Sequence, residues 1–406
     1  MKKILSVILA LTLLCGMWGC SMLSQPDSTD KQPVSESTGQ ATSPSTEPGT
    51  PPENDTPAIP SAPMVAVSMP TTTVHTKADN GIVIFSQTSQ ELSMTLNDPE
   101  VAEKIILDFM NRVESKHSEV DSILSNATND YDGSLDWNPY LNHIAYDPMR
   151  LDQNIFSLFG CYAIYQGSMH PETQFLSVNY DLVTGNTLSL DDILTDKTTP
   201  DDLYALVIDE LALKDKDYYL FSDYQELVKP SFGTNIFRSE NWYLSANGLC
   251  FFFQPYEIAP YASGVIVAEI PYEKLWGILE DAFFPAETDI VSGQIAGKQF
   301  SNVKPNEFSK YGELILDDQA DNIVVYTDGT IQNIRIEIGE WSASGAYFTP
   351  QNIVFAATSL SQGEAILIEA KLDNKLPSMR LYFESNGKTE CRFIAKDESG
   401  NIVLKP

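Results

Sequence analysis

Histidines, cysteines and paired carboxylates are the side chains of this 406-residue chain that could do chemistry. The four histidines, His75, His117, His143 and His170, show neither an HExxH motif nor another metal-ligand spacing. The chain also lacks a GxSxG nucleophile elbow and a glycine-rich phosphate loop. We therefore expect no catalytic residues, no metal site and no cofactor, although dispersed carboxylates could still meet in the fold.

Carboxylates gather at three places in the sequence. The stretch "NDYDGSLD", residues 129–136, carries oxygen ligands that calcium prefers, but Pro139 stands where a bidentate glutamate would close the loop. The stretch is therefore interpreted as a solvated loop. The pairs Asp191-Asp192 and Asp201-Asp202 stand at expected helix starts, where the helix dipole stabilises negative charge without any catalytic role.

Three cysteines follow Cys20, namely Cys161, Cys250 and Cys391, and they form no CxxC motif. Cys161 and Cys250 lie in strongly apolar stretches, where a free thiol behaves as a small buried hydrophobe. A disulfide between these two remains an alternative, because spacing alone does not determine pairing.

One segment, "PYEIAPY" at residues 255–261, interrupts a good strand pattern with two prolines, two tyrosines and a glutamate. The prolines fix φ and remove backbone donors, so the strand must end there. Tyr256 and Tyr261 offer stacking faces with polar tips, and Glu257 could pair with a cation or accept from sugar hydroxyls. The segment is either a ligand surface or a rigid corner whose tyrosines cover the core.

The N-terminus predicts export. Lys2 and Lys3 precede an apolar run from Ile4 to Leu14, which is a signal-peptide pattern and is short for a transmembrane helix. The run leads to Gly19-Cys20, which resembles the lipobox of bacterial lipoproteins. That resemblance implies cleavage after residue 19 and a diacylglycerol anchor on Cys20. We expect residues 1–19 to be the signal peptide.

Residues 20–63 are rich in Ser, Thr, Pro and acids, and their composition predicts a disordered tether. The whole chain has a formal net charge of -31. Such a charge disfavours nucleic acid, and we expect no nucleic-acid partner, because phosphate contacts need clustered Lys and Arg. It suits solubility and also suits a cationic partner.

Residues 64–287 predict an α+β domain, with a mixed or antiparallel sheet and helices on one face. Asn80-Gly81 and Asn247-Gly248 mark hairpin turns. Asn97-Asp98-Pro99 opens a long amphipathic helix whose apolar face continues to Leu124. A closing helix is expected over "PYEKLWGILEDAF", which begins at Pro271.

Residues 288–406 change to short strands at the spacing of an all-β, immunoglobulin-like sandwich. Asn386-Gly387 and Ser399-Gly400 mark further hairpin turns. No motif with catalytic chemistry stands out in this range, so it is interpreted as an accessory module.

Residues 64–285 resemble the exported domain of RsiV-type, lysozyme-sensing anti-sigma factors, which belongs to a domain-of-unknown-function family. The matched features are Gly167 through His170, Asn179 to Leu182, Thr184-Gly185, Leu188 to Leu194, Pro255 to Ile258, Pro260 to Ala262 and Gly264. The resemblance implies capture of a basic protein outside the cell and adds His170 to Tyr256, Glu257 and Tyr261 as a candidate ligand-binding residue. Only Met1 to Lys3 precede the apolar run, so we expect no sigma-factor regulation by this chain.

Together these patterns predict a non-catalytic binding protein, lipid-anchored on the extracellular face of the cytoplasmic membrane. Its expected ligand is a cationic protein such as lysozyme, or a wall glycan such as peptidoglycan. The alternatives are a peptidoglycan-modifying enzyme and a purely structural envelope interaction protein.

Overall fold

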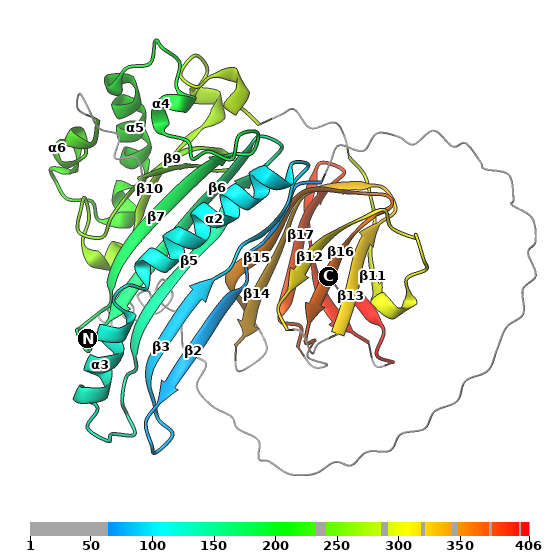
Figure 1. Ribbon diagram of the computed structural model, residues 1–406. Helices are drawn as coiled ribbons and strands as arrows, with labels where there is room; N and C mark the ends of the chain where they lie inside the picture. The colour runs from blue at the N-terminus through cyan, green and yellow to red at the C-terminus, as the bar shows by residue number, and fades with distance from the viewer. Residues whose placement is uncertain are drawn as a thin grey trace, which may run out of the picture. The chain divides into compact units, whose positions relative to one another are not determined.

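The computed structural model describes residues 64–232, 241–285, 291–317, 321–342, 347–372, 376–397 and 399–405 (Figure 1). The predicted signal peptide, Cys20 and the predicted tether lie outside these residues. Every element described below lies within Pro63–Pro406.

A five-stranded sheet forms the centre of the N-terminal half, with strand order β2-β3-β5-β6-β7. Its strands are β2 (Thr71–Lys77), β3 (Val83–Gln90), β5 (Tyr140–Leu151), β6 (Ile155–Tyr165) and β7 (Glu172–Asp181). β3 and β5 are parallel, and the other neighbours are antiparallel. The predicted turn at Asn80-Gly81 joins β2 to β3, and Gly81 has the positive φ of 85° that such a turn uses.

Helix α2 (Pro99–Lys116) lies across β5, β6 and β7 (Figure 1). Asp98 caps it as predicted, because its side chain accepts from the backbone N–H groups of Glu100 and Val101. The single long helix predicted to reach Leu124 is wrong. The chain breaks after Lys116, and α3 (Val120–Asp130) packs on a different cluster around β3 and the start of β5. Two helices serve two patches of the sheet that one straight helix cannot reach together.

A three-stranded sheet, ordered β10-β9-β8, covers the opposite face of the five-stranded sheet. Its strands are β8 (Trp242–Leu244), β9 (Gly248–Phe253) and β10 (Ile266–Pro271). Because side chains alternate along a strand, β9 serves two cores. Cys250 and Phe252 pack against Phe159 of β6, whereas Leu249 and Phe251 pack toward the helices on the other side.

Three helices follow β7, namely α4 (Leu190–Ile193), α5 (Pro200–Tyr218) and α6 (Tyr224–Val228). Leu203, Val207 and Leu211 of α5 are fully buried against β8, β9 and β10. The helix predicted from Pro271 is wrong, because the chain forms only two 3-10 turns there, Tyr272–Lys274 and Asp281–Phe283.

The C-terminal half contains two sheets around one core. The four-stranded sheet is ordered β11-β13-β16-β12, with β11 (Ile295–Gln299), β12 (Lys310–Ile315), β13 (Asp321–Thr327) and β16 (Glu364–Ala370). The seven-stranded sheet is ordered β19-β18-β17-β14-β15-β1-β4. Its strands are β1 (Ala66–Ser68), β4 (Ser93–Thr95), β14 (Thr330–Trp341), β15 (Phe348–Ser361), β17 (Met379–Ser385), β18 (Lys388–Lys396) and β19 (Ile402–Lys405).

Strand β1 belongs by sequence to the predicted α+β domain, yet it lies between β15 and β4 in the seven-stranded sheet. Strands from both sides of residue 288 therefore share one hydrogen-bonded sheet. The contact continues where the Ile353 backbone N–H donates to Asp147 Oδ1 at 3.2 Å and Arg335 Nη2 donates to the Met149 carbonyl at 3.3 Å.

Mixed and antiparallel sheets with few helices give an α+β architecture. Among the described residues, no helix has the length and apolar character needed to cross a membrane.

Candidate functional site

The structure brings together three of the candidate residues from two loops. His170 lies in the loop between β6 and β7, and Tyr256 and Tyr261 lie in the loop between β9 and β10. The rings of His170 and Tyr261 stack, with centroids 3.8 Å apart and an interplanar angle of 19°. Tyr256 lies 5.5 Å from Tyr261 and 6.4 Å from His170, measured between ring centroids. We call His170, Tyr256 and Tyr261 the aromatic cluster.

Gln254, which the sequence did not single out, fixes the position of the β9–β10 loop. Its side-chain amide donates to the Phe175 carbonyl and accepts from the Phe175 N–H, both at 2.8 Å. This pair of hydrogen bonds continues the pairing of the sheet beyond the end of β9, where Pro255 has no backbone N–H to donate. A glutamine directly before a strand-ending proline is the only sequence signal for this contact.

Glu257 serves the corner itself. Its Oε2 accepts from the Gln254 backbone N–H at 2.8 Å, and its own N–H donates to the Gln254 carbonyl at 3.0 Å. The carboxylate therefore caps the turn at Pro255, which is the rigid-corner interpretation for this residue.

Tyr261 joins the two loops. It is half-buried, and its hydroxyl donates to the Pro171 carbonyl at 3.1 Å. It begins a 3-10 turn, Tyr261–Ser263, which ends at Gly264 with φ of 69°. The His170 ring covers one face of the Tyr261 ring, so Tyr261 has a structural role in the cluster as well as a partly exposed surface.

Tyr256 has the opposite character. Its side chain is 60% exposed, and its backbone has a φ of 72°, in the left-handed region. A non-glycine residue in this region costs on the order of 1 kcal/mol. Its hydroxyl lies 3.4 Å from His170 Nε2, a long contact. Tyr256 is the third residue of the turn closed by the bond from the Glu257 N–H to the Gln254 carbonyl, directly after Pro255, and turns of this kind take a positive φ at that position. The turn leaves the ring on the surface beside His170.

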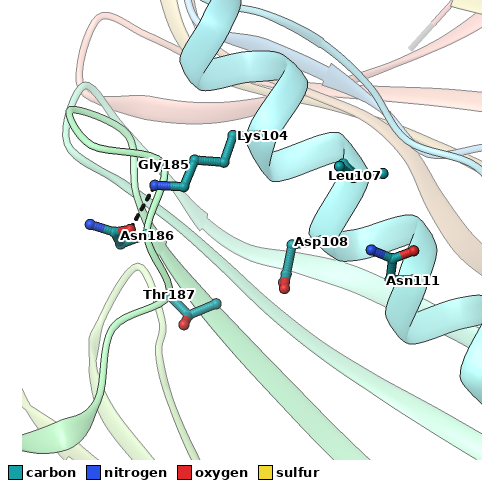
Figure 2. Close-up of a pocket in the computed structure, with 7 residues that line it drawn as sticks. All are labelled: Lys104, Leu107, Asp108, Asn111, Gly185, Asn186 and Thr187. Atoms are coloured by element: carbon teal, nitrogen blue, oxygen red, sulfur yellow. Dashed lines mark hydrogen bonds between the residues drawn. The ribbon is translucent and has the colours of Figure 1, made fainter.

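A groove of about 340 Å³ lies between α2 and the turn before α4. In Figure 2, Lys104 reaches from α2 to the turn, where its Nζ donates to Asn186 Oδ1 at 2.6 Å. The same Nζ donates to the Thr184 carbonyl at 3.0 Å. Asp108 on the same helix accepts from Tyr180 Oη at 2.8 Å. The groove contains none of the candidate residues, and these bonds clamp the predicted turn at Thr184-Gly185-Asn186 onto α2.

One serine and one histidine lie within hydrogen-bonding distance outside the cluster. His75 Nδ1 is 2.9 Å from Ser86 Oγ on the exposed β2–β3 hairpin. No carboxylate in the described part of the chain contacts His75. The pair therefore lacks the orienting acid of a catalytic triad.

The buried titratable groups are separate from this pair. Burial raises the pKa of the Cys250 thiol to about 12, so this cysteine is not an activated nucleophile. Burial also lowers the pKa of His143 to about 4 and raises that of Asp147 to about 6. Cys161, Cys250 and Cys391 form no disulfide, so the alternative of a Cys161–Cys250 disulfide is wrong.

The described ranges contain no group of three or more His, Cys, Asp or Glu residues that could hold a metal ion. In the acidic stretch at 129–136, Asp132 Oδ1 accepts from the Ser134 N–H at 2.8 Å. In the same stretch, Asp130 Oδ2 accepts from Tyr140 Oη at 2.8 Å. These carboxylates thus support the local turn.

Residues 191–273 match the family model described as "Protein of unknown function (DUF3298)". The matched range includes the β9–β10 loop with Tyr256 and Tyr261, and it excludes His170.

One curated relative is an esterase, Rv3036c of Mycobacterium tuberculosis, which is 28% identical over 106 residues. The matched stretch is 26% of this chain and 44% of the esterase, so the chain spans less than half of that relative.

Two solved structures of DUF3298 proteins are also similar. A protein from Bacteroides fragilis is 18% identical, with 53% of this chain and 94% of that chain covered and a TM-score of 0.37. A protein from Pseudomonas aeruginosa is 16% identical, with 54% and 97% covered and a TM-score of 0.37.

Proposed function

We propose that this protein is a non-catalytic, lipid-anchored binding protein on the extracellular face of the cytoplasmic membrane, and that it captures a macromolecular ligand of the cell envelope through the aromatic cluster. The observation that carries this proposal is Tyr256, an exposed aromatic side chain held in a strained backbone conformation on a loop fixed by Gln254. Preorganised, exposed aromatic side chains are typical binding hot spots.

The ligand class rests on charge and on the sequence resemblance. A net charge of -31 attracts a basic protein such as lysozyme, the ligand that the resemblance to RsiV-type exported domains implies. A wall glycan is the alternative ligand, because sugar rings stack on tyrosine faces. Titrations with lysozyme and with soluble peptidoglycan fragments distinguish the two.

The deciding variant is Tyr256→Ala. We expect it to weaken capture of lysozyme at least tenfold, about 1.4 kcal/mol or more, with little change in melting temperature. Tyr347→Ala is the matched control, since Tyr347 is 74% exposed and far from the cluster in sequence. Full affinity in the Tyr256 variant, for lysozyme and for the fragments, would refute the proposal.

Glu257→Gln tests whether charge acts at the cluster itself. Because Glu257 Oε2 already accepts from the Gln254 N–H, we expect the salt dependence of lysozyme binding to stay as in the wild type. A flatter salt dependence would show that the carboxylate faces the ligand.

The lipid anchor rests on the lipobox-like Gly19-Cys20 after an apolar run. Cys20→Ser should release the protein from membranes or leave the signal peptide uncleaved, as followed by fractionation and mass spectrometry. Unchanged processing together with unchanged membrane retention would contradict it.

The strands after residue 288 are proposed to act as an accessory module of immunoglobulin-like type. Two sheets that share one core support this interpretation.

A peptidoglycan-modifying esterase is the second candidate, favoured by the name of the Mycobacterium tuberculosis relative and by the contact between Ser86 and His75. Hydrolysis of p-nitrophenyl acetate and of acetylated peptidoglycan tests it. Activity that is lost in Ser86→Ala would establish the esterase, and no activity in the wild type would exclude it for these substrates.

A further inference from the structure

Trp276 is a large aromatic side chain that the sequence analysis did not select. It is 70% exposed, and it follows β10 in the loop that leads to Phe284. Its indole stacks on the half-buried Phe284 ring, with centroids 4.4 Å apart and an interplanar angle of 12°. One face of the indole is therefore supported from below, and the side chain is largely open to solvent.

The loop that carries Trp276 is held by hydrogen bonds from Arg150 and Thr195. Arg150 is 4% exposed, and its Nη1 donates to Tyr272 Oη at 2.7 Å and to the Phe283 carbonyl at 2.6 Å. On the other side, Thr195 Oγ1 donates to the Gly277 carbonyl at 2.9 Å. The indole is thus presented by a fixed scaffold, which reduces the entropy lost when a partner binds.

The loop that carries Trp276 also carries exposed carboxylates. Glu273, Glu280 and Asp281 are exposed in the same loop, and none forms an ion pair with a described lysine or arginine. Lys274, the only basic residue between Glu273 and Asp281, is bound to Glu210, with Nζ and Oε1 2.6 Å apart.

The neighbouring segment adds to this field. The Glu280 backbone N–H donates to the Ile193 carbonyl at 3.0 Å, which places the loop beside the acidic stretch 191–198. That stretch has three aspartates and one lysine. An ammonium or guanidinium group over the indole would gain both the cation–π attraction and the field of the carboxylates.

We propose that Trp276, with Glu273, Glu280 and Asp281, forms a second interaction surface that binds lysine or arginine side chains of a basic polypeptide. This "Trp276 surface" is distinct from the aromatic cluster, because the two loops leave opposite ends of β10. β10 has six residues, so its length places the two loops about 20 Å apart. A neutral sugar could also stack on the indole, but the unpaired carboxylates favour a cation.

The local field can be measured on the full chain by fluorescence quenching. The signal of Trp276 is obtained as the difference between the wild type and Trp276→Phe. With each quencher referred to its effect on free N-acetyltryptophanamide, we expect caesium to be more efficient on this component than iodide, with neutral acrylamide as the measure of exposure. A higher relative efficiency of iodide than of caesium would overturn the proposal.

Binding is tested with nona-arginine as the probe. Trp276→Ala leaves the net charge unchanged, so nonspecific attraction to an acidic protein stays the same. We expect this variant to bind the peptide on the order of three- to thirtyfold more weakly, the range that a cation–π contact gives. Tyr347→Ala, which also removes an exposed aromatic side chain, should bind as the wild type does.

Two further arms separate the alternatives. N,N′,N″-triacetylchitotriose, a neutral glycan, should not bind at Trp276, and a Trp276-dependent response to it would overturn the cationic assignment. Tyr256→Ala should leave nona-arginine binding unchanged, so failure of the aromatic-cluster proposal and failure of this one are distinguishable. Equal affinity for nona-arginine in the wild type and in a folded Trp276→Ala, checked by near-ultraviolet circular dichroism, would refute the proposal.

Discussion

The loops at the two ends of β10 use similar residues in opposite ways. The loop before the strand commits its carboxylate inward, since Glu257 caps the turn at Gln254, and it leaves an aromatic ring outside. The loop after the strand also leaves an aromatic ring outside, Trp276, but it leaves Glu280 and Asp281 outside as well. The same pairing of aromatic and acidic residues therefore leaves a carboxylate bound to the backbone at one end of β10 and exposed carboxylates at the other.

The difference shows that a carboxylate can bind a ligand only where the backbone beside it does not already use its oxygens, whatever the residue type. Glu257 and Glu280 are equivalent in a sequence, and only the backbone groups beside them separate a structural carboxylate from a free one. Variants that release or remove the internal bonds of each loop test this comparison directly.

The largest effect is expected from Arg150→Ala. The substitution removes the hydrogen bonds that Arg150 donates to the Tyr272 hydroxyl and the Phe283 carbonyl. It also removes the ion pair with Asp152, in which Nε and Oδ2 are 2.6 Å apart. We expect a loss of about 3 kcal/mol in the free energy of unfolding, because a nearly buried arginine network is broken. Urea unfolding measures it.

Arg112→Ala is the matched control for that variant. Arg112 also pairs with an aspartate at 2.6 Å, but its side chain is 33% exposed. We expect a loss below about 1 kcal/mol. A loss below about 1 kcal/mol in Arg150→Ala as well would show that the fold does not depend on the Arg150 network.

Tyr261→Ala should come next, with a loss of about 2 kcal/mol, because the stacked ring and the bond to Pro171 both disappear. Tyr261→Phe retains the stacking and should recover about half of that loss. If the alanine variant melts like the wild type, Tyr261 belongs to the exposed surface and not to the support of the loop.

The loop after β10 should also respond to alkaline pH, through Tyr272. Burial raises the pKa of Tyr272 to about 12 from its ordinary 10.0, even though Arg150 acts in the opposite direction. The folded state thus holds the proton more tightly. The stabilisation is fully present below pH 10 and is lost as the pH rises through about 12.

The measurement is the free energy of unfolding of the wild type and of Tyr272→Phe between pH 9 and pH 12, monitored by circular dichroism. The wild type should lose on the order of 1 kcal/mol relative to the variant, with the half-exposed side chain taken into account. Parallel pH profiles would contradict a role for the buried hydroxyl.

The smallest effect is expected from Tyr256→Gly. Glycine adopts a φ of 72° without steric cost, so we expect the protein to be stabilised by up to about 1 kcal/mol while it loses its ligand. The melting temperature and one lysozyme titration measure the two effects. A marked loss of stability would show that the ring is needed for the fold.

Local signals predicted much of the fold. The Asp98-Pro99 helix start and the Asn-Gly hairpins at 247 and 386 are confirmed, because each depends only on adjacent residues. The helix expected after Pro271 is wrong, although Leu275 and Leu279 have helical spacing. Gly277 adopts a φ of 78°, which ends any helix there, and Leu279 forms a β-bridge with Leu194. That bridge joins residues far apart in the sequence, so no local pattern reveals it.

The sequence was enough to select residues of the candidate site, but it did not predict how they lie relative to one another. The proline-flanked tyrosines attracted attention by themselves, but the stack of Tyr261 on His170 joins two loops that only the sheet pairing brings together. Trp276 was predicted to lie in a helix that does not form, so its exposure was not predicted.

The position of β1 has a mechanical consequence. Any tension applied through the N-terminal segment reaches the described fold at β1, which is enclosed by β15 on one side and β4 on the other. The Thr358 N–H donates to the Val65 carbonyl at 2.9 Å, the Met69 N–H donates to the Val354 carbonyl at 2.8 Å, and Met64 and Met69 are fully buried. The load would therefore pass into the seven-stranded sheet and not through the loops at the two ends of β10.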